Sequence, residues 1–80
     1  MDQIRKFTRK LNAKLRKHVE EVIEHILLNH WEGLDIKPLQ GKQGWFRCRI
    51  GDIRILFVRL PNGVLVLKRA GFRGEVYKGL

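Results

Sequence analysis

An arginine-rich segment, residues 45–59 (WFRCRIGDIRILFVR), constrains the possible folds more than any other part of the chain. Apolar and charged residues alternate along it on both sides of Gly51-Asp52, a pair that suits a two-residue type II′ turn with glycine first. A turn this tight pairs Ile50 with Ile53, and the remaining pairs follow in order. We therefore predict a β-hairpin with two different faces, because cross-strand partners share a face.

The two faces of this hairpin differ in chemistry. The apolar face consists of Phe46, Cys48, Ile50, Ile53, Ile55 and Phe57. The opposite face carries Trp45, Arg47, Arg49 and Arg54. Three guanidinium groups beside an aromatic ring suggest a site for a polyanion, since guanidinium binds phosphate in a bidentate way. An ordinary solvated strand face is the alternative, and the hairpin alone does not decide between the two.

The segment before the hairpin is predicted to be helical. Apolar residues recur at helical spacing between residues 4 and 27, and Asn12 interrupts the pattern as a suitable N-cap. We predict helices at about residues 3–10 and 13–29, which together form a helical hairpin over residues 3–29. Residues 34–44 are interpreted as a connector, because a proline and two glycines punctuate them.

A third strand follows the hairpin. The Pro61-Asn62-Gly63 turn returns the chain as an antiparallel strand at residues 64–69. This strand adds Leu65 and Leu67 to the apolar face and Lys68 to the arginine face. Residues 71–80 are expected to form a C-terminal segment that completes the domain.

The apolar sheet face needs a cover, and the helical region supplies it. We therefore predict a single α+β domain over residues 1–80, with the N-terminal helical hairpin packed on one face of a three- to four-stranded antiparallel sheet at about residues 45–70. The other face of the sheet stays open and basic.

The amino-acid composition limits the possible classes of binding partner but does not identify one. The net charge of +9 favours nucleic acid, an anionic membrane surface or an acidic protein as partner. No apolar run is long enough to span a bilayer, and the charged N-terminus lacks the apolar stretch of a secretory signal. The single cysteine, Cys48, allows no intramolecular disulfide and suits a reducing cytoplasm. No metal-ligand spacing is present, so we expect neither a metal nor another cofactor.

Three motifs in order resemble one protein family. They are residues 33–41 (GLDIKPLQG), 46–55 (FRCRIGDIRI) and 71–77 (GFRGEVY). No single motif is specific, but the three together at this spacing resemble the RelE/ParE superfamily of toxins from type II toxin–antitoxin systems. The resemblance covers about residues 4–80 and is strongest to the RelE-like branch.

The resemblance implies a ribosome-dependent endoribonuclease, an mRNA interferase that inhibits translation. Such toxins cleave mRNA in the ribosomal A site without a metal, by attack of a 2′-hydroxyl on the adjacent phosphate. The implied catalytic residues are Arg47, Arg49, Arg54, Arg73 and Tyr77. We add Trp45, Lys68 and Phe72 as predicted RNA contacts. Guanidinium groups can stabilise the charge that grows on the phosphate, but arginine is a poor proton acceptor. Tyr77, which the resemblance implies for the site, can stack on a nucleobase and assist proton transfer.

The resemblance also implies partners, namely a cognate antitoxin protein, the ribosome and mRNA, and no membrane. Two departures from the family are visible. Its members usually begin with a β-strand, whereas here the chain leads almost directly into helix, so the sheet is one strand short or its edge is left for a partner. Some relatives use a late histidine or glutamate as base, but residues 31–80 contain no histidine, and Asp52 and Glu75 are the carboxylates expected nearby.

Two other functions remain open from the sequence. One is a ParE-like inhibitor of DNA gyrase, or a toxin relative that has lost cleavage and acts as a binding module. ParE-type members lack most of the basic cleavage set, which argues against gyrase. The other is a general nucleic-acid binder that uses the same basic surface.

Overall fold

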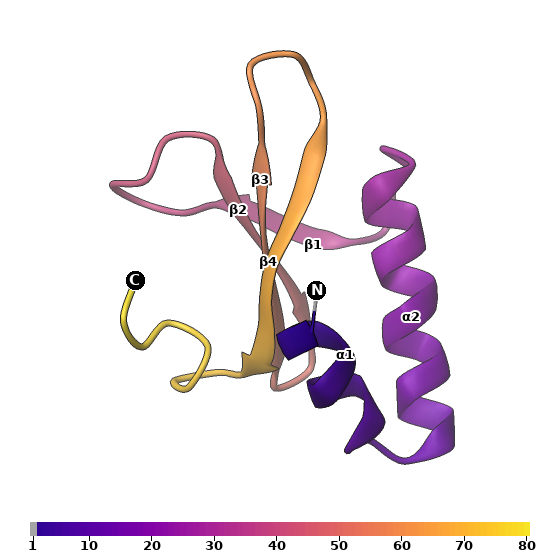
Figure 1. Ribbon diagram of the computed structural model, residues 1–80. Helices are drawn as coiled ribbons and strands as arrows, with labels where there is room; N and C mark the ends of the chain where they lie inside the picture. Colours follow the sequence, from indigo (N-terminus) through magenta and orange to yellow (C-terminus); the bar gives the residue numbers. More distant parts are fainter. Residues whose placement is uncertain (1) are drawn as a thin grey trace.

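The computed structural model describes residues 2–80. The elements are α1 (Asp2–Arg9), α2 (Ala13–Leu27), β1 (Asp35–Pro38), β2 (Trp45–Ile50), β3 (Ile53–Arg59) and β4 (Leu65–Phe72). The strands form one antiparallel sheet in the order β1-β2-β3-β4, and both helices lie on the same side of it (Figure 1). This arrangement confirms the predicted α+β class. Within residues 2–80, no helix is long and apolar enough to cross a membrane.

The boundaries of α2 follow from its capping residues. The Asn12 side chain accepts a hydrogen bond of 2.8 Å from the backbone N–H of Leu15, as the N-cap prediction required. The helix ends at Leu27, two residues earlier than predicted. Asn29 adopts a left-handed backbone with φ of 61°, a conformation in which a helix cannot continue.

The central hairpin has the predicted register. Ile50 pairs with Ile53 across the turn, and Phe46 pairs with Phe57 further along. Gly51 has a φ of 57°, the positive value that the first position of a type II′ turn needs. The apolar face of the hairpin packs under the helices. The buried core comprises Ile4, Leu11, Val19, Val22, Ile26, Cys48, Ile53, Ile55, Phe57 and Ala70.

The connector prediction for residues 34–44 is partly wrong, because it contains β1. This short strand lies at the edge of the sheet and pairs with β2, with Lys37 opposite Arg47 and Pro38 opposite Phe46. A proline is tolerated in an edge strand, because the backbone groups on the outer edge of that strand have no neighbouring strand to bond to. The sheet therefore has four strands, and within residues 2–80 all of them follow the helices.

A β-bulge in β4 changes which residues face the core. Phe57 pairs with Leu67, whereas its neighbour Leu56 pairs with Arg69, so Lys68 has no cross-strand partner. Because of this extra residue, Leu67 and Ala70 both pack toward the helices. Arg69 consequently lies on the opposite face, although strict alternation from Leu67 would have placed it against the core.

Candidate nucleic-acid interface

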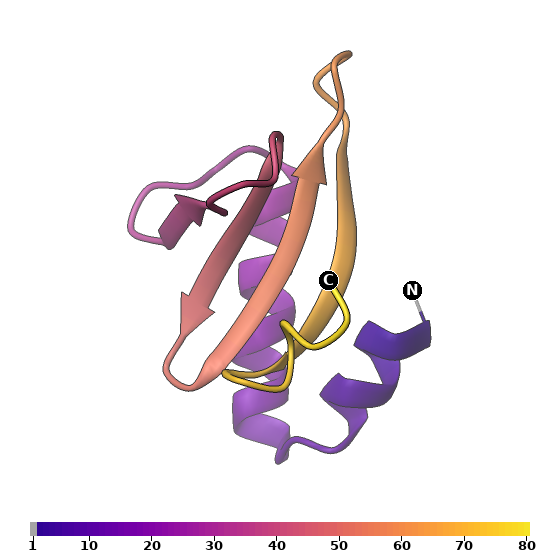
Figure 2. The ribbon, with the colours of Figure 1, turned by 90° about the vertical axis from the view of Figure 1, so that its left-hand side faces the viewer.

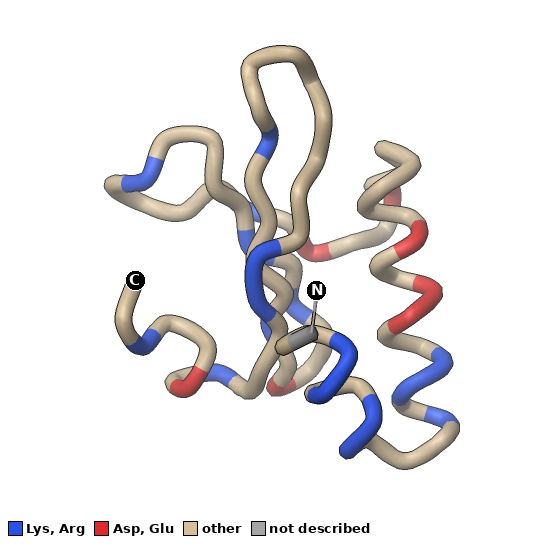
Figure 3. The backbone as a smooth tube through the Cα atoms, viewed as in Figure 1, with Lys and Arg blue, Asp and Glu red and all other residues tan. Residues whose placement is uncertain are grey.

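The sheet face that turns away from the helices, called the open face below, gathers arginines from three strands. It carries Arg47 and Arg49 from β2, Arg54 from β3 and Arg69 from β4. Basic positions run through the neighbouring strands in Figure 3, and acidic positions are found on α2 as well as in the sheet and the C-terminal segment. Arg49 and Arg54 are direct cross-strand partners. Like charges in that position destabilise a sheet, so this arrangement costs stability and favours a functional role.

One carboxylate, Asp35, holds two of these arginines. Nη1 of Arg47 donates to Oδ1 of Asp35 at 3.2 Å and to its backbone oxygen at 3.1 Å. Nε of Arg49 lies 3.3 Å from Oδ2 of Asp35. The Arg47 side chain is 17% exposed and that of Arg49 is 55% exposed. Arg49 is therefore the more accessible member of a preorganised pair whose charge Asp35 partly neutralises.

Asp35 was missing from the sequence-based site. Asp52 and Glu75 were expected to be the nearby carboxylates, but Asp35 is the acidic residue that contacts the arginines. The omission follows from reading residues 34–44 as a loop. In a strand, the alternation of Asp35, Ile36 and Lys37 places the aspartate and the lysine on the open face beside β2.

Arg54 lies on the open face next to the hairpin turn. Its Nη1 donates to the backbone oxygen of Gly51 at 2.8 Å and to that of Ile53 at 3.2 Å. These bonds occupy one nitrogen of a group that has five N–H donors. Within residues 2–80, no carboxylate forms an ion pair with Arg54, so its positive charge is available to an anion.

The C-terminal segment, residues 73–80, turns back across the lower part of the open face (Figure 2). Leu56 of β3 and Val76 of this segment are both buried, although neither belongs to the main core. The segment packs against β4 at Gly71, where an added Cβ would lie 3.5 Å from the Cβ of Val76, in ordinary van der Waals contact. The segment is therefore part of the folded domain.

Two anchors fix the segment that carries Arg73 and Tyr77. The backbone N–H of Arg73 donates to the backbone oxygen of Asp52 at 2.8 Å, which joins the segment to the hairpin turn. The guanidinium group of Arg69 donates to the backbone oxygens of Val76, at 3.1 Å, and of Lys78. Tyr77 lies between these two acceptors and is 37% exposed. Sequence reasoning missed Arg69, because only the bulge turns it toward the open face.

The three predicted RNA contacts lie in different places. Trp45 is on the open face at the far end of β2, with Nζ of Lys42 at 5.0 Å from its ring centroid. Lys68 is exposed in the bulge of β4. Phe72 is placed on the helix side, where its ring meets that of Phe7 edge-on at 5.2 Å. Phe72 therefore lies away from the arginines of the open face, because its cross-strand partner Ile53 belongs to the apolar face.

Cys48 lies between the two layers and takes no part in the open face. Burial raises the pKa of its thiol to about 11; the charge of Asp35 adds to this rise, and Arg47 opposes it. A thiol with this pKa is protonated at neutral pH and is a poor nucleophile. Among the described residues, no group of three or more His, Cys, Asp or Glu could hold a metal ion.

Comparison with known proteins identifies the fold. No family model matches the chain, and no curated protein matches it. The structure is similar to a chain of the RelB–RelE antitoxin–toxin complex from Methanococcus jannaschii, with a TM-score of 0.75 and 21% sequence identity. The match covers 94% of this chain and 89% of that one. The fold is therefore the RelE-like α+β fold, with two helices on a four-stranded antiparallel sheet.

Proposed function

We propose that this chain is the toxin of a toxin–antitoxin pair, and that it is a ribosome-dependent endoribonuclease. One observation carries the proposal, namely the open face on which Arg47, Arg49 and Arg54 lie together, with the segment of Arg73 and Tyr77 anchored beside the hairpin turn. The similar complex contains both an antitoxin and a toxin. The assignment to the toxin rests on this chain's own arginines and motifs.

The proposed reaction needs positive charge and one proton carrier. The 2′ oxygen of the RNA forms a bond to phosphorus, the bond from phosphorus to the 5′ oxygen breaks, and a 2′,3′-cyclic phosphate and a 5′-hydroxyl result. Negative charge grows on the phosphate oxygens, where the unpaired guanidinium group of Arg54 can bind them. A proton must leave the 2′-hydroxyl and another must reach the 5′ oxygen. Arginine can do neither, so we assign proton transfer to Tyr77.

Asp35 acts in this proposal as an internal competitor of the phosphate. Its two carboxylate oxygens contact Arg47 and Arg49, the groups that we assign to substrate binding. A phosphate and a carboxylate offer guanidinium the same kind of paired acceptor oxygens. RNA must therefore displace Asp35 from Arg49, the more exposed of the two, before both arginines can hold it.

Replacing Asp35 with asparagine is expected to tighten the binding of RNA. Asparagine keeps the shape of the side chain but removes the charge that competes with phosphate, and an exposed ion pair of this kind is worth up to about a factor of five. Fluorescence anisotropy with a short single-stranded RNA, over a range of salt concentrations, measures the change. Asp52→Asn is the matched control, because it removes the same charge from an exposed turn residue that forms no ion pair within residues 2–80. Equal effects of the two substitutions would show that Asp35 contributes only net charge.

Primer extension on mRNA in a translating extract tests the proposed activity directly. Addition of the purified chain should produce new 3′ ends within codons, and these ends should vanish when ribosomes are removed. Cleavage should persist when a chelator selective for zinc is added, because such a chelator leaves the magnesium that the ribosome needs. Intact mRNA under conditions of arrested translation would refute cleavage by this chain.

A binding module without cleavage is the second candidate, favoured by the pairing of Asp35 with Arg47 and Arg49. In that case mRNA stays intact. Inhibited DNA supercoiling in a gyrase assay would then identify the ParE-like alternative. The two assays together separate the enzyme from the binding module.

A further inference from the structure

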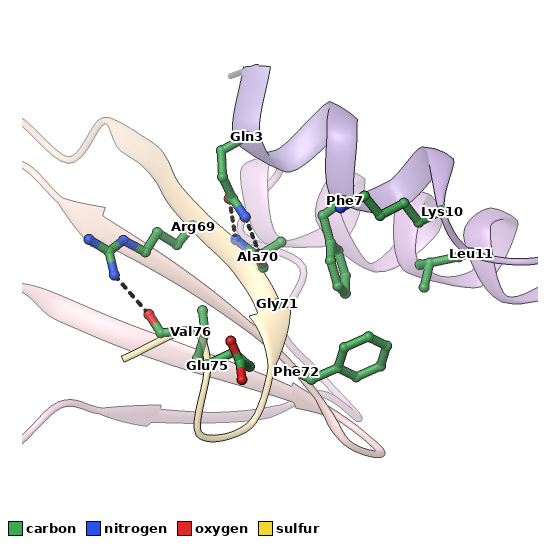
Figure 4. A pocket seen from close by; sticks show the side chains of 10 residues that line it. All are labelled: Gln3, Phe7, Lys10, Leu11, Arg69, Ala70, Gly71, Phe72, Glu75 and Val76. Carbon is green, nitrogen blue, oxygen red and sulfur yellow. Dashed lines mark hydrogen bonds between the residues drawn. The ribbon is translucent and has the colours of Figure 1, made fainter. Parts of the chain in front are cut away.

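The outer edge of β4 is occupied by a side chain in place of a strand. β4 is the last strand of the sheet, and α1 lies beside it. Nε2 of Gln3 donates to the backbone oxygen of Ala70 at 2.6 Å, and the backbone N–H of Ala70 donates to Oε1 of Gln3 at 3.0 Å (Figure 4). The carboxamide of Gln3 thus makes the two bonds that a residue of a neighbouring strand makes in a hydrogen-bonded antiparallel pair.

Next to this edge lies a hollow of about 560 Å³. Its lining includes Phe7 from α1, Leu11 from the turn that follows α1, and Phe72 from β4. Phe72 is 48% exposed although it is large and aromatic. An edge strand with an apolar trough beside it suits an extended peptide, because the strand supplies backbone bonds and the trough accepts alternate side chains.

The charge around the hollow selects the peptide. Lys10 and Arg69 line it, and Lys6 lines an adjoining hollow on the same side of α1. Glu75 is the acidic residue in the lining, and Nζ of Lys78 lies 3.7 Å from its carboxylate. A second copy of this chain would bring its own net charge of +9 and its own basic α1 to the same place. An acidic segment of another protein is attracted there instead.

We propose that the outer edge of β4 is a docking site for an extended, acidic segment of a partner protein, which adds a fifth strand to the sheet after displacing the Gln3 side chain. Gln3 keeps the edge hydrogen-bonded in the free chain, and this lowers the risk of self-association. Because Gln3 is on the surface and its bonds are side-chain bonds, a peptide can replace it without unfolding β4. The identification of the partner with an antitoxin rests on the proposed function, whereas the docking site does not.

Titration of the ¹⁵N-labelled chain with a blocked eight-residue peptide of alternating glutamate and valine tests the proposal by NMR. We expect shifts at the amide of Ala70 and its neighbours in β4, and slower exchange of the peptide's own amides. Gln3→Ala should bind the peptide roughly ten-fold more tightly, because two competing hydrogen bonds are gone. Gln43→Ala, an exposed glutamine in the loop between β1 and β2, is the matched control and should bind as the parent chain does.

Charge and site are tested separately. Lys10→Glu should weaken binding of the acidic peptide more than Lys17→Glu, an exposed position on α2. A peptide that alternates lysine and valine should not bind. Shifts confined to the arginines of the open face, an unchanged affinity in Gln3→Ala, or a dimer of the chain at the β4 edge would each overturn the proposal. None of these measurements depends on RNA cleavage, so loss of the nuclease proposal leaves this one standing.

Discussion

Arg54→Ala is expected to abolish detectable mRNA cleavage, with a loss of about 10²–10³-fold in rate. That factor is typical for removal of one preorganised donor that stabilises charge in a transition state. Arg54 and Arg69 are the arginines of the open face without a carboxylate partner in residues 2–80. The guanidinium group of Arg69 is held by backbone oxygens of the C-terminal segment, whereas Arg54 lies beside the hairpin turn, where its charge is available to the phosphate. Primer extension in a translating extract gives the rate, and growth arrest in cells gives the biological consequence.

The fold should survive this substitution. The hydrogen bonds of Arg54 go to backbone oxygens of its own hairpin turn, where water can replace the guanidinium group. Arg54→Lys keeps the charge but loses the two-pronged geometry, so it should recover only part of the activity. Arg9→Ala, at an exposed site at the end of α1, controls for net charge and should cleave normally. Arg73→Ala should behave like Arg54→Ala, and full toxicity in both variants would refute the assigned site.

The hairpin could be predicted in register because two independent signals agree there. Apolar and charged residues alternate from Phe46 to Ile55 on both sides of the turn, and a glycine stands at the turn position that needs a positive φ. A shift of the pairing by one residue would have moved three arginines into the core. The observed register therefore has a much lower free energy than the neighbouring registers. The helices followed from the same logic, since one apolar sheet face required one apolar cover.

The features that the sequence did not reveal depend on tertiary contacts. β1 has only four residues and ends in proline, so it gains its strand structure from pairing with β2. The bulge at Lys68 has no local sequence signature, yet it decides the face of Arg69. Only part of the candidate site could therefore be predicted from the sequence. The arginines of the hairpin were found, whereas Asp35 and Arg69 were missed, and Phe72 lies on the helix side of the sheet, away from these arginines.

Two single-residue deletions in β4 test whether the bulge determines which residues face the core, and we expect them to differ strongly in stability. Removal of Lys68 leaves Leu67 and Arg69 opposite the partners that they already have, Phe57 and Leu56, in an unbroken ladder. The ΔLys68 chain should therefore unfold cooperatively, with a Tm lower by about 5–10 °C, the shift expected for loss of roughly 1–2 kcal/mol in a domain of this size. Circular dichroism during heating measures it.

Removal of Ala70 should abolish folding, although it takes away a smaller side chain. Without Ala70, either Arg69 moves opposite Ile55 into a position that is now 1% exposed, or Gly71 fills that position and Phe72 turns to the open face. An arginine buried there without a partner costs several kcal/mol, which is comparable with the whole stability of about 4–12 kcal/mol expected for a domain of this length. If both deletion chains fold equally well, or if ΔLys68 fails to fold, then the bulge is not what sorts the two faces of β4.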